Sequence, residues 1–85
     1  MDTLSDLPNI GSIVAKQLEQ VGITSYEQLK QIGSKEAWLR IQIIDASACI
    51  HRLYALEGAI RSIKKTLLPP EVKEDLKHFY EEHKL

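Results

Sequence analysis

Apolar residues recur along most of this 85-residue chain at steps of three and four, the period of an amphipathic helix. The alternation of apolar and polar residues that predicts a strand does not occur in the sequence. The pattern therefore predicts an all-α fold, a compact bundle of five to six short helices. A chain of this length forms one small domain, to whose stability a second copy or a partner protein would add.

Glycine and proline residues separate the expected helices. Pro8 ends the first, Gly22 the second and Gly33 the third, because helices stop before a proline or at a left-handed glycine. We expect helices, in chain order, at residues 2–7, 11–20, 25–32, 35–44, 45–68 and 70–85. Three starts have two candidate residues each: Gly11 or Ser12, Asp45 or Ser47, and Pro70 or Glu71.

Three helices are preceded by residues whose side chains can cap a helix N-terminus. Asp2 and Thr3 suit the first helix. Thr24 and Glu27 have the spacing of a capping box, in which each side chain satisfies a free amide of the other. Ser34 suits the fourth helix. The apolar face expected for that helix consists of Ala37, Trp38, Ile41 and Ile44.

The fifth expected helix is the longest and carries one continuous apolar stripe. The stripe contains Cys49, Leu53, Leu56, Ile60, Ile63 and Leu67, so Cys49 is expected in the core. Gly58 within the helix costs roughly 1 kcal/mol relative to alanine, which a close crossing with another helix would explain. Its neighbour Glu57 is interpreted either as a half-buried acid paired with Arg40 or Arg61, or as a surface residue at the crossing.

A Leu-Pro-Pro sequence at residues 68–70 breaks the fifth helix and leads to a final amphipathic helix. We expect residues 1–68 to form the body and residues 69–85 to add a C-terminal helix to the same domain. Two arrangements fit this pattern. The helix either folds back on the body, which is the commoner arrangement, or reaches a second subunit.

The turn before the second expected helix carries the chemistry that points most directly to a function. A turn that opens a helix leaves backbone N–H groups without partners, and such groups bind phosphate. Gly11 permits close approach, and Lys16 adds a positive charge one turn later. The predicted phosphate-binding residues are Asn9, Ile10, Gly11, Ser12, Ile13 and Lys16. The alternative is that this turn only reverses the chain and that Ile10 fills the core.

A basic cluster is the second candidate for contact with phosphate. Arg61, Lys64 and Lys65 are three and four residues apart, which places them on one face of the fifth expected helix. The alternative is a solvated face near a helix C-terminus, where cations are favourable. The net charge of −1 argues against strong binding of DNA by the chain alone, because neutralisation of phosphate supplies most non-specific affinity.

The sequence has no catalytic constellation: no nucleophile motif, paired carboxylates or glycine-rich phosphate loop. The three histidines lack the spacing of metal ligands. We therefore expect no enzymatic activity, metal, cofactor or small-molecule substrate. One cysteine, and the lack of a signal peptide or of roughly 20 consecutive apolar residues, predict a cytoplasmic protein that does not contact a membrane.

Two stretches of the sequence resemble known elements. Residues 7–29 resemble the helix-hairpin-helix motif, which holds a nucleic-acid backbone without reading its bases. The stretches Leu-Tyr-Ala-Leu-Glu-Gly-Ala-Ile-Arg at 53–61 and Leu-Pro-Pro-Glu-Val-Lys at 68–73, taken together with that motif, resemble the C-terminal domain of the TfoX (Sxy) family. The resemblance covers nearly the whole chain. Asn9 departs from it, because DNA-binding hairpins commonly have glycine there.

The family resemblance implies a bacterial, cytoplasmic domain of the SAM/helix-hairpin-helix-like class, related to regulators of competence genes. Two hypotheses about its function follow. The first is a DNA-binding or transcription-accessory module that contacts the phosphate backbone. The second is a protein-interaction or homo-oligomerisation module that keeps the scaffold without binding nucleic acid. The expected partners are accordingly DNA, a transcription regulator or other protein, or a second copy of the chain.

Overall fold

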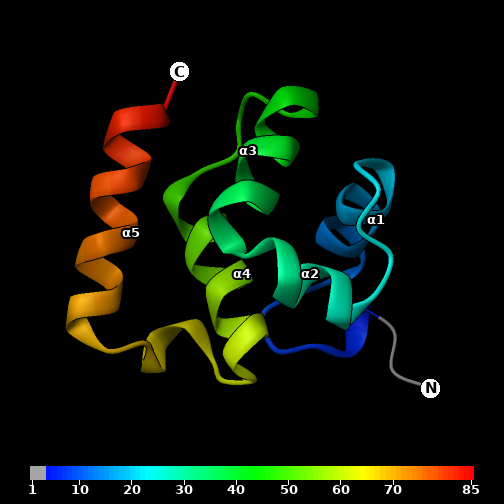
Figure 1. Ribbon diagram of the computed structural model, residues 1–85, viewed down its shortest axis with the longest axis horizontal. Helices are drawn as coiled ribbons and strands as arrows, with labels where there is room; N and C mark the ends of the chain where they lie inside the picture. The colour runs from blue at the N-terminus through cyan, green and yellow to red at the C-terminus, as the bar shows by residue number, and fades with distance from the viewer. Residues whose placement is uncertain (1–3) are drawn as a thin grey trace.

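The computed structural model describes residues 4–85, which form five α-helices and two short 3₁₀ helices (Figure 1). In chain order the elements are η1 (Leu4–Asp6), α1 (Ser12–Gln20), α2 (Tyr26–Ile32), α3 (Ser34–Ile44), α4 (Ile50–Arg61), η2 (Lys65–Leu67) and α5 (Pro70–His83). No strand occurs between residues 4 and 85, so the predicted all-α fold is confirmed. The predicted cap of the first helix by Asp2 and Thr3 lies outside the described residues.

Helix α4 lies at the centre of the molecule, in contact with α2, α3 and α5, while α1 lies at the opposite end from α5 (Figure 1). One hydrophobic core contains residues from all five α-helices. Its largest fully buried side chains are Trp38, Leu18, Ile23, Leu29, Ile41, Leu53, Leu56 and Leu76. None of the helices in residues 4–85 has the length and apolar character needed to span a membrane.

The bounds of α1 follow from the local sequence. The helix begins at Ser12, directly after Gly11, and buries Leu18. Gly22 has a φ of 87°, a left-handed conformation that glycine adopts without steric cost. The amide of Ile23 then donates to the carbonyl of Leu18 at 2.8 Å, which satisfies one of the free carbonyls at the helix end. The predicted second helix and its glycine stop are confirmed.

The N-cap of α2 is one residue later than predicted. Ser25, not Thr24, is the N-cap, and its hydroxyl accepts a hydrogen bond from the amide of Gln28 at 3.2 Å. The side-chain oxygen of Gln28 in turn accepts hydrogen bonds from the amide and hydroxyl of Thr24 at 2.7 and 2.9 Å. The prediction that Thr24 and Glu27 form the capping box was wrong because the neighbouring Ser-x-x-Gln sequence offers the same chemistry.

Two predictions for α3 were wrong. Ser34 is the first residue of the helix, and its hydroxyl donates to Oε1 of Glu57 at 2.6 Å, while Gly33 occupies the N-cap position. Ile44 is 48% exposed although Trp38 and Ile41 of the same predicted face are fully buried. Ile44 is the last residue of α3, and the chain leaves the helix directly after it.

Helix α4 starts later than predicted, at Ile50 instead of Asp45 or Ser47. The side chain of Asp45 accepts hydrogen bonds from the amide and hydroxyl of Ser47 at 3.0 and 2.5 Å. An aspartate that bonds to the backbone two residues later stabilises a turn in competition with a helix. Cys49 therefore precedes the helix and is exposed, so the expectation that it lies in the core was wrong.

Helix α4 also ends earlier than predicted. Ser62 adopts a left-handed conformation with a φ of 60°, and the helix stops at Arg61. The predicted apolar stripe is therefore interrupted, and Leu67, which lies beyond the helix, is 65% exposed. We call residues 62–67, which join α4 to the segment before α5, the connector. Its irregular backbone brings it close to the turn before α1, as described below.

Helix α5 folds back on the rest of the chain. Leu76 is buried, and the rings of Phe79 and Tyr80 pack edge-on against Trp38 with centroid distances of 6.1 and 5.7 Å. An ion pair of 2.8 Å between Lys35 and Asp75 adds a contact with α3. In this single chain the C-terminal helix thus packs against α3 and α4.

Candidate nucleic-acid interface

The turn that opens α1, residues 7–11, is held by backbone hydrogen bonds between residues three apart in the sequence. The amide of Leu7 donates to the carbonyl of Leu4 at 3.1 Å, and the amide of Ile10 donates to the carbonyl of Leu7 at 3.2 Å. Ile10 is 4% exposed, so its side chain fills the core as the alternative interpretation expected. Because its amide also donates to Leu7, Ile10 has neither a side chain nor a free N–H to offer to a phosphate, unlike the residues that follow it.

The N-terminus of α1 faces solvent. Gly11 is its N-cap and supplies no side-chain hydrogen bond, and the space around Gly11 is open. Ser12, Ile13 and Lys16 are exposed, with Ile13 72% exposed. The first N–H groups of a helix have no partner within it and carry part of the positive end of its dipole. The structure thus brings together, at one accessible helix end, the amides and the lysine that the sequence singles out.

Asn9 is placed differently from the other predicted residues. Its backbone has a φ of 69°, the left-handed conformation that asparagine tolerates better than most residues. Its side chain points into the molecule, where Nδ2 donates to the carbonyl of Ile63 at 2.9 Å and Oδ1 accepts from the amide of Lys65 at 2.9 Å. The amide group of Asn9 is therefore committed to the connector and does not extend toward solvent beside Gly11.

The basic cluster is not on one helix face, because α4 ends before it is complete. Lys64 and Lys65 belong to the connector, next to the turn that opens α1. With Pro8, Asn9 and the other connector residues, they line a hollow of about 860 Å³. The prediction of a shared face was wrong, but the fold places both lysines beside the predicted hairpin site.

Arg61 is separated from these lysines and has a structural partner. Its Nε donates to Oε2 of Glu57 at 2.6 Å, one turn earlier on α4. Glu57 also accepts from the hydroxyl of Ser34, which links α4 to the start of α3. Of the alternatives for Glu57, pairing with Arg61 is the one the structure contains, while Arg40 pairs with Glu36 at 3.1 Å.

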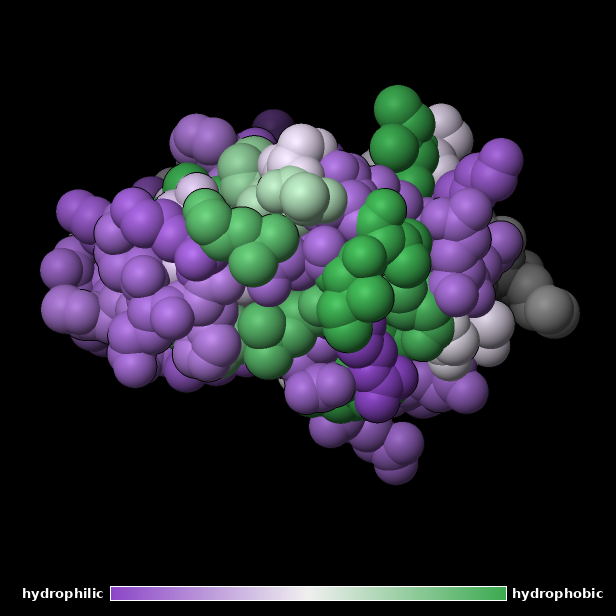
Figure 2. All heavy atoms as spheres, turned by 90° about the horizontal axis from the view of Figure 1, so that it is seen from above, coloured by the Kyte–Doolittle hydropathy of each residue, from purple (hydrophilic) through white to green (hydrophobic). Residues whose placement is uncertain are grey.

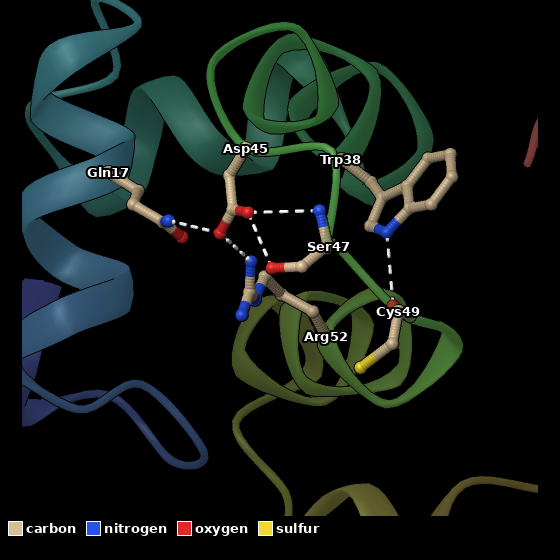
Figure 3. Close-up of polar contacts among 6 residues, drawn as sticks. All are labelled: Gln17, Trp38, Asp45, Ser47, Cys49 and Arg52. Carbon is tan, nitrogen blue, oxygen red and sulfur yellow. Dashed lines mark hydrogen bonds and ion pairs between the residues drawn. The ribbon is translucent and has the colours of Figure 1, made fainter. Parts of the chain in front are cut away.

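Asp45, the C-cap of α3, connects α1 and α4 through its side chain (Figure 3). Oδ2 of Asp45 accepts from Nε2 of Gln17 on α1 and from Nη1 of Arg52 on α4, both at 2.8 Å. These bonds and those from Ser47 hold the pKa of Asp45 well below its ordinary value; the Ser47 hydroxyl contributes most, followed by Gln17 and Arg52. The network links the second half of α1, through Gln17, to the start of the turn after α3 and to α4.

A second surface feature is apolar and lies at the C-terminal end of α3. Ile43 is 84% exposed and Ile44 48% exposed. Figure 2 shows apolar side chains gathered on this face of the molecule, with polar groups of α5 at one side. The sequence pattern missed Ile43 and wrongly assigned Ile44 to the core.

No group of three His, Cys, Asp or Glu residues suited to a metal ion occurs in residues 4–85.

These features define the class of protein: a small all-α domain in which a tight turn presents the N-terminus of a helix to solvent. The family model of the TfoX C-terminal domain matches residues 1–80, and the chain belongs to that family. Protein Sxy of Escherichia coli strain K12 is 33% identical over 75 residues, which are 88% of this chain and 36% of that protein. The chain thus spans about a third of the length of this relative.

Two solved structures from Listeria monocytogenes have the same fold. The triclinic crystal form of an uncharacterized protein matches with a TM-score of 0.94 and 44% identity, covering 95% of this chain and 92% of that one. A tetragonal form of a protein of unknown function matches with a TM-score of 0.89 and 45% identity, covering 92% of this chain and 96% of that one. The architecture described above is therefore shared with chains of similar length.

Proposed function

We propose that this domain is a non-enzymatic, cytoplasmic DNA-binding or transcription-accessory module that contacts the phosphate backbone. The observation that carries the proposal is the uncapped, solvent-facing N-terminus of α1, with Gly11, Ser12 and Ile13 exposed and Lys16 one turn away. Exposed amides at a helix N-terminus bind phosphate without distinguishing bases. Contacts of this kind position a protein on DNA and leave sequence selection to another component.

The charge distribution predicts weak binding of DNA by the isolated domain. The net charge is −1, and five of the acids lie in residues 69–85 against three lysines. Residues 1–68 carry a net charge of +1. Because each neutralised phosphate adds to affinity and to its dependence on salt, few contacts mean modest affinity. Such a module would act together with a partner protein or a second copy.

Family membership supports the regulatory part of the proposal. The TfoX family resemblance links the domain to regulators of competence genes, and Sxy matches this domain within a chain about two and a half times as long. We propose a role in which the domain contributes the backbone contact to a regulatory assembly. A shared domain does not by itself fix the function, so the site must be tested directly.

Fluorescence anisotropy with a short duplex and a single strand, at about 50 and 200 mM salt, tests this proposal. We expect micromolar or weaker binding that weakens with salt. Lys16→Glu should abolish it, because it places a negative charge beside the phosphate. The helical circular dichroism signal should not change, since Lys16 is exposed.

Lys77→Glu is the matched control, because it makes the same charge change at an exposed position on α5, away from α1. It should retain most of the affinity that Lys16→Glu loses. Equal loss with both variants would reveal only a net-charge effect. No binding by the wild-type chain at 50 mM salt would overturn the proposal.

A second candidate function, protein interaction, is favoured by one specific observation. Ile43 and Ile44 expose apolar surface at the end of α3, where a solitary domain gains nothing from it. If this surface joins two copies, sedimentation should give a dimer mass that Ile43→Ser reduces to that of a monomer. A monomeric wild-type chain at high concentration would count against self-association.

A further inference from the structure

Asn9 connects two segments that are far apart in the sequence. Its side chain makes hydrogen bonds of 2.9 Å with the backbone of Ile63 and of Lys65, 54 and 56 residues away. A longer contact of 3.5 Å reaches the carbonyl of Ala55 on α4. One amide side chain thus occupies both a carbonyl and an N–H of the connector, as a neighbouring strand would.

Gly58 of α4 makes room for this contact. A Cβ atom added at Gly58 would lie 2.5 Å from Nδ2 of Asn9, 2.8 Å from the carbonyl oxygen of Ile63 and 3.2 Å from the amide nitrogen of Lys65. The expected explanation, a close crossing of two helices, was wrong. The close approach is between α4, the Asn9 side chain and the backbone of the connector. Asn9 and Gly58 are therefore two halves of one arrangement.

The backbone of Asn9 also favours this residue. A φ of 69° is costly for most side chains, and asparagine and glycine adopt it most readily. Glycine would satisfy the backbone but could not bond to the connector. Asparagine satisfies both requirements, which accounts for its presence at a turn position where a ligand-binding backbone would otherwise favour glycine.

We propose that Asn9 is a positioning residue that holds the connector against the hairpin, so that Lys64 and Lys65 and the N-terminus of α1 form one surface for a phosphodiester backbone. The inference rests on the proposed function for its ligand. Lys64, Lys65 and Asn9 line the same hollow. The hydrogen bond from the Lys65 amide to Asn9 holds this part of the connector beside the turn that opens α1. Lys64 and Lys65 thus act through their position beside the turn that opens α1, and not as part of a helix face.

A double-mutant cycle tests this inference. Asn9→Gly keeps the left-handed backbone and removes the contact, while Lys64→Ala with Lys65→Ala removes the charges. In the wild-type background the lysine changes should weaken binding of a short duplex several-fold and lower the salt slope by about 2, since each phosphate contact contributes about 0.9. In the Asn9→Gly background they should change affinity less than twofold. Equal effects in both backgrounds would overturn the inference.

Two further measurements separate positioning from loss of folding or loss of function. Amide exchange at Lys65 should rise in Asn9→Gly more than exchange at Leu29, which lies in the core. Gly58→Ala, which leaves Asn9 in the sequence, should reproduce both effects, because the added Cβ would displace the Asn9 side chain and the connector backbone that it holds. Unchanged exchange at Lys65 in both variants would show that Asn9 does not hold the connector. Absence of binding by the wild type would overturn the ligand assignment and, separately, the proposed function.

Discussion

Asp45 joins α1 to α4 through hydrogen bonds from Gln17 and Arg52. Four hydrogen bonds from three residues lower the pKa of its carboxyl group, led by the Ser47 hydroxyl. A group whose pKa is lower in the folded state stabilises the protein above its unfolded pKa, here near 3.8. That contribution is lost as the pH falls through the folded value. Acid should therefore weaken the fold progressively below about pH 4.

Asp45→Asn should make the free energy of unfolding lower at neutral pH and less dependent on pH below 4. Urea unfolding followed by circular dichroism at several pH values between 7 and 2 measures both quantities. Ser47→Ala removes the largest single contribution to the lowered pKa and should give an intermediate slope. If Asp45→Asn loses stability in acid as steeply as the wild type, the assignment to Asp45 is incorrect.

At the scale of the element, α5 depends on a few apolar contacts with the body. Leu76 is 2% exposed, and Phe79 and Tyr80 pack on Trp38. Leu76→Ala should lower the free energy of unfolding by about 2–4 kcal/mol, because it removes buried methyl groups and leaves a cavity. Thermal or urea unfolding provides the measurement. Leu67→Ala, at a leucine that is 65% exposed, should change stability by less than about 0.5 kcal/mol.

Equal losses from the two leucine variants would mean that α5 does not pack on the body as described. A large loss for Leu76→Ala with little change for Leu67→Ala would support the fold-back arrangement. The comparison is sharp because both substitutions remove the same atoms.

The elements that the sequence predicted well are those set by neighbouring residues. Gly22 ends α1 and Gly33 ends α2 because a left-handed glycine is a local signal. The errors arose where several local signals compete, as at Thr24 and Ser25, or where a polar side chain diverts an apolar pattern, as at Asp45. The apolar period alone predicted a helix that continues through the turns before and after α4, and it was therefore too long at both ends.

The candidate site also has local features that the sequence predicts and a long-range contact that it does not. The exposed amides of Gly11 and Ser12 follow from the local turn, and the sequence predicted them. The contact between Asn9 and the connector joins residues more than 50 positions apart, and a single sequence carries no signal for such a pair. Gly58, a glycine within a helix, predicted a close contact at this position. The sequence analysis assigned that contact to another helix, whereas the structure has Asn9 and the connector there.

At the scale of the whole molecule, two surfaces with different chemistry lie on different parts of this small domain. The proposed basic and amide-rich surface combines the start of α1 with the connector, and the apolar surface lies at the end of α3. A module with both can contact DNA at one surface and a protein at the other. We expect the proposed contact with DNA to be weak and sensitive to salt when it acts alone, because the charge of residues 1–68 is near neutral.

Mapping of backbone amide shifts by NMR during titration with a short duplex tests the central claim most directly. Phosphate held by the hairpin should perturb the amides of Gly11, Ser12 and Ile13 first, together with those of Lys64 and Lys65. Raising the salt concentration from about 50 to 200 mM should reverse these changes. Shifts confined to the end of α3, or no shifts at all, would contradict the account and leave the hairpin as scaffold.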